Sequence, residues 1–101
     1  MSANQLLLEA IALKKCVTAT YNNVRMVLAP HILYSKHDAV FIDAVALERD
    51  GAVPKDKKLG AFNLAGLKDL VLTERVFRPE TLFDPSASKY NDVTLFTVGG
   101  V

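Results

Sequence analysis

Arg25 is the side chain in this sequence best suited to holding an anionic ligand. It belongs to a stretch in which Val24, Met26 and Leu28 occupy alternate positions, so in an extended strand Arg25 points away from the apolar face. A guanidinium group can bind phosphate or carboxylate oxygens through two parallel hydrogen bonds. Two interpretations stay open: Arg25 is an exposed strand arginine, or it anchors an anion.

Tyr21 and His31 flank Arg25 in the sequence and could line the same groove. A neutral His31 could donate a hydrogen bond to an oxygen of a ligand, and a protonated one would donate more strongly. The alternative is that backbone groups satisfy its ring. Phe41 could stack on a nucleobase, which contributes about 1–3 kcal/mol per base, or it could belong to the core.

Lysines cluster in one predicted loop, at Lys55, Lys57 and Lys58. They form either a local basic patch or an ordinary solvated loop. An ammonium group acts as a point charge rather than as a fork, so Lys57 and Lys58 could assist an arginine in binding an anion. The predicted ligand-binding residues are therefore Tyr21, Arg25, His31, Phe41, Lys57 and Lys58.

Asp43 interrupts the most apolar segment of the chain, residues 39–48. A charged group is costly to bury without partners. We therefore expect Asp43 either to lie on the solvent face of its strand or to pair with a cation, for example Arg25 on an adjacent strand.

No group of residues indicates catalysis or a metal site. His31 and His37 stand six positions apart beside Asp38, which matches no standard metal-ligand spacing. Cys16 is the only cysteine, so an internal disulfide is excluded, and we expect it to be a small buried hydrophobe. Neither a nucleophile with its base nor a glycine-rich phosphate loop is present. We predict a protein that is not an enzyme and needs no cofactor.

The size and composition of the chain predict one globular domain. It has 101 residues, of which 50% are hydrophobic and 23% charged. With 12 basic and 11 acidic side chains, its net charge of +1 offers no broad basic surface for nucleic acid. No apolar run approaches the roughly 18 residues of a membrane span, and no basic segment precedes Leu6 as in a signal peptide. We expect a cytoplasmic protein that has no contact with membranes.

Hydrophobic periodicity predicts one helix followed by short strands. Ser2 and Gln5 have the spacing of a capping box, and apolar residues at three- and four-residue intervals extend the helix over about 3–15. From residue 16 onward the apolar period changes to two. Pro30 is expected to end or kink a strand, because proline cannot donate to a ladder. The expected extended segments are 17–21, 24–29, 32–34, 39–48, 61–64, 68–73 and 93–98.

Strands that follow one another without crossover helices exclude a parallel α/β sheet. Closing the sheet on itself would remove its exposed edges. We predict a mainly β domain with one N-terminal helix, folded as a small SH3/Sm-like β-barrel of five to six antiparallel strands. The barrel would cover about 16–73, and a tail with the final strand would cover about 74–101 of the single domain 1–101.

The order of these pieces resembles the WYL domain, a small β-barrel ligand-sensing module found mostly in bacterial regulators. WYL domains open with a helix, continue with a strand ending in tyrosine, and then have an arginine strand leading to a proline. The counterparts here are Tyr21, Arg25 and Pro30. The name-giving triplet falls on Val-Phe-Ile at 40–42, and the closing strand pair falls on 60–67. The resemblance covers roughly residues 6–73.

The resemblance implies a non-catalytic, ligand-sensing regulatory domain that binds a nucleotide, a small anion or short single-stranded nucleic acid, as in transcription regulation. Family members usually couple the barrel to a helix-turn-helix, whereas here one helix precedes it, so we expect a stand-alone sensor. The family places arginines near the positions held by Gly60 and Gly66. The alternative is a degenerate barrel that acts as a protein-interaction or dimerisation module, with 93–98 available for edge pairing.

Overall fold

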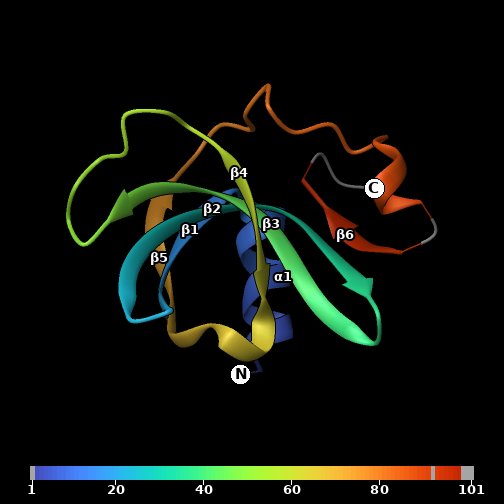
Figure 1. Cartoon of the computed structure of the whole chain (residues 1–101), viewed down its shortest axis with the longest axis horizontal. Helices are drawn as coiled ribbons and strands as arrows, with labels where there is room; N and C mark the ends of the chain where they lie inside the picture. Colours follow the sequence, from blue (N-terminus) through green and yellow to red (C-terminus); the bar gives the residue numbers. More distant parts are fainter. Residues whose placement is uncertain (1, 92, 99–101) are drawn as a thin grey trace.

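The computed structural model describes residues 2–91 and 93–98, and its helix lies at the N-terminus, as predicted (Figure 1). Helix α1, Ala3–Leu13, begins at a complete capping box, in which Ser2 and Gln5 satisfy each other's backbone N–H groups. It ends at Lys14, which adopts the left-handed conformation with φ 55°. The predicted end at residue 15 is therefore too late, because Lys15 already begins the first strand.

Six strands follow the helix, and every recorded pairing between them is antiparallel. The short 3-10 helix η1, Leu64–Gly66, joins the fourth strand to the fifth, and η2, Ser88–Tyr90, precedes the sixth. The sheet has the order β4-β3-β2-β1-β5, and β6 pairs with β2. The strands are β1, Lys15–Tyr21; β2, Val24–Lys36; β3, Ala39–Arg49; β4, Leu59–Asn63; β5, Lys68–Val76; and β6, Thr94–Thr97.

The long strand β2 carries two neighbours along the same edge. Its other edge pairs with β3, whereas β1 lies beside Val24–Leu28 and β6 beside Ile32–Tyr34. Pro30 sits between these two segments, where the register with β3 shifts. Pro30 therefore does not end the strand, because the bulge beside it accommodates its missing N–H group.

The main core lies between α1 and the curved sheet. The helix packs against β1, β2 and β5 and buries Leu7, Ala10 and Ile11. Alternate residues of β1, among them Val17 and Ala19, meet this face of the helix. Cys16 points to the other face of β1 and is buried in a smaller cluster, in accord with the prediction that it is a buried hydrophobe.

The segment after β5 crosses the molecule before it rejoins the sheet at β6 (Figure 1). It starts at Phe77, whose N–H donates to Lys14 O over 2.9 Å, at the end of α1. Phe83 and Tyr90 are buried along its course. We call residues 77–98 the C-terminal strap. Of these, residue 92 lies outside the described part of the chain, as do residues 99–101 of the predicted tail.

The structure confirms the predicted fold class: a mainly β domain with one N-terminal helix and six antiparallel strands in one sheet. Each predicted extended segment overlaps an observed strand, and 24–29 and 32–34 are parts of the single strand β2. Closure into a barrel stays a prediction, because no pairing between the end strands β4 and β5 is recorded among the described residues.

Candidate anion-binding site

Tyr21 and Arg25 project from opposite faces of the β1–β2 pair. The register places Tyr21 opposite Val24 and Arg25 opposite Thr20, and successive residues of a strand alternate between the two faces. The Tyr21 ring lies edge-on to Phe62 within the core, with 5.1 Å between ring centroids. The structure therefore does not bring Tyr21 and Arg25 together in one groove.

Arg25 binds to its own sheet. Its Nη1 donates to Thr20 Oγ1 over 3.2 Å and to Asp69 O over 3.1 Å, and its Nη2 donates to Thr18 Oγ1 over 2.8 Å. These bonds connect β2 to β1 and β5 across the exposed face of the sheet. An anion at this position would compete with three existing hydrogen bonds.

His31 is fully buried and is satisfied by backbone groups. Its Nδ1 lies 2.8 Å from Ala29 O, and its Nε2 accepts a hydrogen bond from the N–H of Glu80 over 3.0 Å. This pattern requires a neutral ring with its proton on Nδ1. Burial lowers the pKa of His31, and the bond to Ala29 O and the Glu80 carboxylate oppose that shift. The ring packs near Phe77 and Phe83, so His31 holds the strap and lines no groove with Arg25.

Phe41 is half-buried and lies parallel to the Tyr34 ring, with 5.9 Å between centroids and 20° between planes. It packs against the main core, next to the place where the strap returns to the sheet. Its contacts are those of a core residue. Among the described residues, no cation–π contact between Phe41 and Arg25, Lys57 or Lys58 is recorded.

Asp43 is 1% exposed, so the expectation that it faces solvent is wrong. The suggested partner Arg25 is also wrong, because the cation beside Asp43 is Lys89, at 2.7 Å from Oδ2. The same Oδ2 accepts a hydrogen bond from Tyr90 Oη, and Oδ1 accepts one from Tyr34 Oη over 2.7 Å. Three donors thus compensate for the burial of the carboxylate.

The Asp43 cluster extends beyond its hydrogen bonds. The ammonium group of Lys89 lies 5.6 Å from the Tyr34 ring centroid and 5.1 Å from that of Tyr90, within the range of cation–π attraction. Burial, with the bond to Asp43 as a smaller cause, raises the pKa of both tyrosines. Lys89 and Tyr90 were absent from the predicted functional residues. The signal that could have found them is Asp43 itself, because a carboxylate in an apolar strand requires donors from elsewhere.

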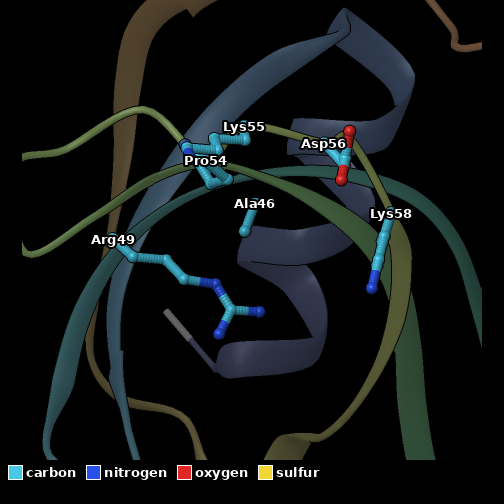
Figure 2. Close-up of a pocket in the computed structure, with 6 residues that line it drawn as sticks. All are labelled: Ala46, Arg49, Pro54, Lys55, Asp56 and Lys58. Atoms are coloured by element: carbon cyan, nitrogen blue, oxygen red, sulfur yellow. The ribbon is translucent and has the colours of Figure 1, made fainter.

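A basic pocket lies between the end of β3 and the loop that follows it (Figure 2). Its volume of about 390 Å³ falls within the range of small-molecule sites, roughly 300–1,000 Å³. Figure 2 shows the side chains of Arg49, from β3, and Lys58, from the loop, extending toward the same space. The residues that line this first pocket are Ala46, Arg49, Pro54, Lys55, Asp56 and Lys58.

The local fold explains why a gap exists here. The Asp50-Gly51 turn reverses the chain after β3, with Gly51 at φ 83°, and Arg49 and Ala52 exchange hydrogen bonds of 2.8 and 2.9 Å. β4 rejoins the sheet only at Leu59. Residues 53–58 therefore lie outside the sheet, and the loop that they form passes beside the end of β3. A pocket lies between this strand end and the loop.

The charge of the first pocket favours an anion. Three basic side chains, Arg49, Lys55 and Lys58, and one acidic side chain, Asp56, line it. Over residues 2–91 and 93–98, none of the three basic groups takes part in a salt bridge. Their donors are thus available to a ligand, and only Arg49 can present a planar fork.

A second pocket of about 360 Å³ adjoins the first. It shares Ala46, Pro54 and Lys55 with the first pocket, and its further lining residues are Leu47, Val53, Lys57 and Arg75. Here the basic groups have acidic partners: Lys57 Nζ lies 3.0 Å from Glu80 Oε2, and Arg75 Nη1 lies 2.7 Å from Glu48 Oε2. The second pocket is therefore more nearly neutral than the first.

Two predicted site residues line these pockets together with arginines. Lys58 lines the first pocket with Arg49, and Lys57 lines the second pocket with Arg75. Sequence reasoning assigned the lysines to a loop patch but did not include Arg49 or Arg75. The position of Arg49, directly before an Asp-Gly turn at the end of a strand, was a usable signal. The arrival of Arg75 depends on the course of β5, which local sequence does not reveal.

Comparisons with known proteins leave the site to be judged from its own geometry. No family model, curated protein or solved structure matches the chain. Within the described ranges there is no cluster of three or more histidine, cysteine or acidic side chains that could hold a metal ion. Nor does any helix in those ranges have the length and apolar character needed to cross a membrane.

Proposed function

We propose that this domain is a non-catalytic, ligand-sensing regulatory domain that binds a small anion in the first pocket. The observation that carries the proposal is that Arg49, Lys55 and Lys58, which have no acidic partner among the described residues, line one cavity of ligand size. The resemblance to WYL domains supports the same class of function. The ligands that this resemblance implies are nucleotides, small anions and single-stranded nucleic acid. Nucleotides and nucleic acid carry phosphate groups, and inorganic phosphate is itself a small anion.

The three basic side chains of the first pocket would contact the anion in different ways. Arg49 would hold two oxygens of a phosphate through its fork, and Lys55 and Lys58 would add point charges. Arg49, Lys55 and Lys58 are all exposed, so each contact is screened by water and salt. We therefore expect weak binding of a single phosphate, with a Kd on the order of 0.1–1 mM at low salt.

An NMR titration of the isotope-labelled domain with inorganic phosphate tests this proposal. We expect amide shifts at Arg49 and across residues 54–58 that weaken as salt increases, because screening acts on exposed charges. Arg49→Gln should lower the affinity about fivefold or more. The matched control is Lys36→Gln, which removes one positive charge from an exposed position at the end of β2. An unchanged affinity in Arg49→Gln would exclude this pocket as the site.

A second candidate function is that of a protein-interaction or dimerisation module. β5 ends the sheet path, and among residues 2–91 and 93–98 its recorded pairing is with β1 alone. It exposes Val71 and Val76 to 51% and 67%. An exposed edge strand can pair with a strand of another chain. Light scattering at increasing protein concentration tests self-association: a dimer that Val71→Lys disrupts would favour this function, and a monomer at every concentration would exclude self-association.

A further inference from the structure

Among the described residues that line the first pocket, Asp56 is the one with an acidic side chain. The other charged side chains that line it are those of Arg49, Lys55 and Lys58. Asp56 is exposed, and along residues 2–91 and 93–98 no recorded salt bridge joins it to any of these cations. The pocket therefore offers a ligand both cationic donors and an anionic acceptor.

The acidic group and the arginine occupy different parts of the pocket. Figure 2 shows the Asp56 carboxylate apart from the Arg49 guanidinium group, which extends with Lys58 toward the same space. A phosphate group held by Arg49 and Lys58 would thus leave Asp56 available to another part of the ligand. The phosphate itself gains nothing from Asp56, because two anionic groups repel each other.

The charges of the first pocket restrict what the rest of the ligand can be. Its volume of about 390 Å³ is in the range of sites that enclose drug-sized ligands, so a phosphate alone would not fill it. A carboxylate accepts hydrogen bonds, and its donor in a ligand is a hydroxyl or an ammonium group. Because basic side chains outnumber Asp56 in the lining, the pocket repels an ammonium group but not a neutral hydroxyl.

We propose that the first pocket binds a phosphomonoester of a sugar or another polyol, whose phosphate contacts Arg49 and Lys58 and whose hydroxyl groups donate to Asp56. This inference rests on the proposed anion-binding function of the same pocket and names its ligand class. In dinucleotide-binding folds an acidic residue likewise accepts a hydrogen bond from a ribose hydroxyl. Arg49 and the lysines supply affinity for the phosphate, and Asp56 selects the alcohol that is attached to it.

The test compares glycerol phosphate with propyl phosphate, which share a carbon chain and a phosphate group of the same charge and differ only in hydroxyl groups. Calorimetry at low salt should give an affinity about threefold higher for glycerol phosphate. In Asp56→Asn this preference should fall below about 1.5-fold, because a neutral amide is a weaker acceptor than a carboxylate. The affinity for propyl phosphate should instead rise, by up to about twofold, because a negative charge near the phosphate is lost.

Asp38→Asn is the matched control for Asp56→Asn. It removes the same charge from an exposed residue in the turn between β2 and β3, and asparagine tolerates the left-handed conformation of Asp38. It should leave both affinities and the preference unchanged. Arg49→Gln should weaken both ligands by the same factor, because it acts on the phosphate that they share.

The outcomes separate this inference from the proposed function. Equal affinities for the two ligands, or a preference that persists in Asp56→Asn, would overturn the inference, while binding that Arg49→Gln weakens would leave the proposed function intact. If neither ligand binds to the unaltered protein, both fail. Phosphoethanolamine should bind no more tightly than propyl phosphate, and tighter binding than that of glycerol phosphate would assign Asp56 to an ammonium group and overturn the inference. A preference for glycerol phosphate that requires Asp56 supports it.

Discussion

Two buried polar side chains, Asp43 and His31, hold the C-terminal strap against the β2–β3 hairpin. Asp43 accepts hydrogen bonds from Lys89 and Tyr90 of the strap, and His31 accepts one from the Glu80 N–H. Both residues are at most 1% exposed. A buried polar group that loses its partner costs about 1–3 kcal/mol. Asp43 and His31 therefore stabilise the docked strap chiefly because release of the strap would leave them without hydrogen-bond partners.

Asp43→Ala should destabilise the domain by about 2–4 kcal/mol, because it removes the shared acceptor of Tyr34, Lys89 and Tyr90. Urea unfolding measures the change in the free energy of unfolding. Asp56→Ala, in the exposed loop, is the matched control and should stay within about 0.5 kcal/mol of the unaltered protein. An equally small effect for Asp43→Ala would show that the carboxylate cluster contributes little to stability.

His31 should make stability depend on pH. Burial lowers its pKa in the folded state, so the unfolded chain binds a proton more readily below about pH 6.5. The contribution of His31 is therefore complete above that pH and is lost as the pH falls toward the folded pKa, by up to about 1.36 kcal/mol per pH unit. Urea unfolding between pH 7.5 and 5.5 should show this loss.

The two histidines provide an internal comparison for this pH dependence. His31→Gln should flatten the stability profile, because glutamine does not titrate. His37→Asn replaces an exposed histidine in the left-handed turn between β2 and β3 by a residue that tolerates that conformation. It should leave the profile unchanged. The hypothesis fails if the slope persists in His31→Gln.

At the scale of elements, turns decide how the strands present their side chains. Asn22 and Asn23 both have positive φ and connect β1 to β2 in a two-residue hairpin. This turn places Tyr21 opposite Val24. The turn at Asp50-Gly51 likewise sets the direction of the loop that contains the lysines. The basic pockets therefore lie at the end of β3 rather than beside its middle.

Lys14→Gly should stabilise the domain by about 0.5–1 kcal/mol. Lys14 terminates α1 in a left-handed conformation, with φ 55°, which glycine adopts without the steric penalty of a side chain. The side chain of Lys14 has no recorded bond in the described part of the chain. Thermal unfolding measures the change, with Leu13→Gly as a control that should destabilise a regular helical position. A decrease in stability for Lys14→Gly would contradict the capping argument.

At the scale of the whole molecule, the strap makes the fold one unit. The radius of gyration is 12.4 Å, close to the roughly 13 Å of a compact domain of this length. The strap begins at the end of α1 and returns to β2 through the bond from the Val98 N–H to His31 O. It thereby links β5, the strand that it follows, to β2 in the middle of the sheet path.

The domain should unfold in one cooperative transition, strap included. In a urea titration followed by NMR, the Val98 amide and the core amides of β1 to β3 should lose their native signals at the same midpoint. The reason is that release of the strap would expose Asp43 and His31 without their partners. An earlier midpoint for Val98 would show that the strap opens independently.

Local patterns in the sequence determined the elements of this protein. The capping box predicted the start of α1 and alternation predicted the strands, because each pattern depends on neighbours a few positions apart. The separation of Tyr21 from Arg25 was also readable, since a two-residue turn after Tyr21 sets the register of both.

Only the tertiary structure decided the partners of Asp43 and the composition of the basic pockets. Asp43 meets Lys89 and Tyr90 from 46 and 47 positions along the chain, and the adjoining pockets combine Lys57 with Arg75. These contacts depend on the path of the strap and on the register of strands that are far apart in the sequence. Packing over the whole domain sets that path and that register, and no local sequence pattern reports them.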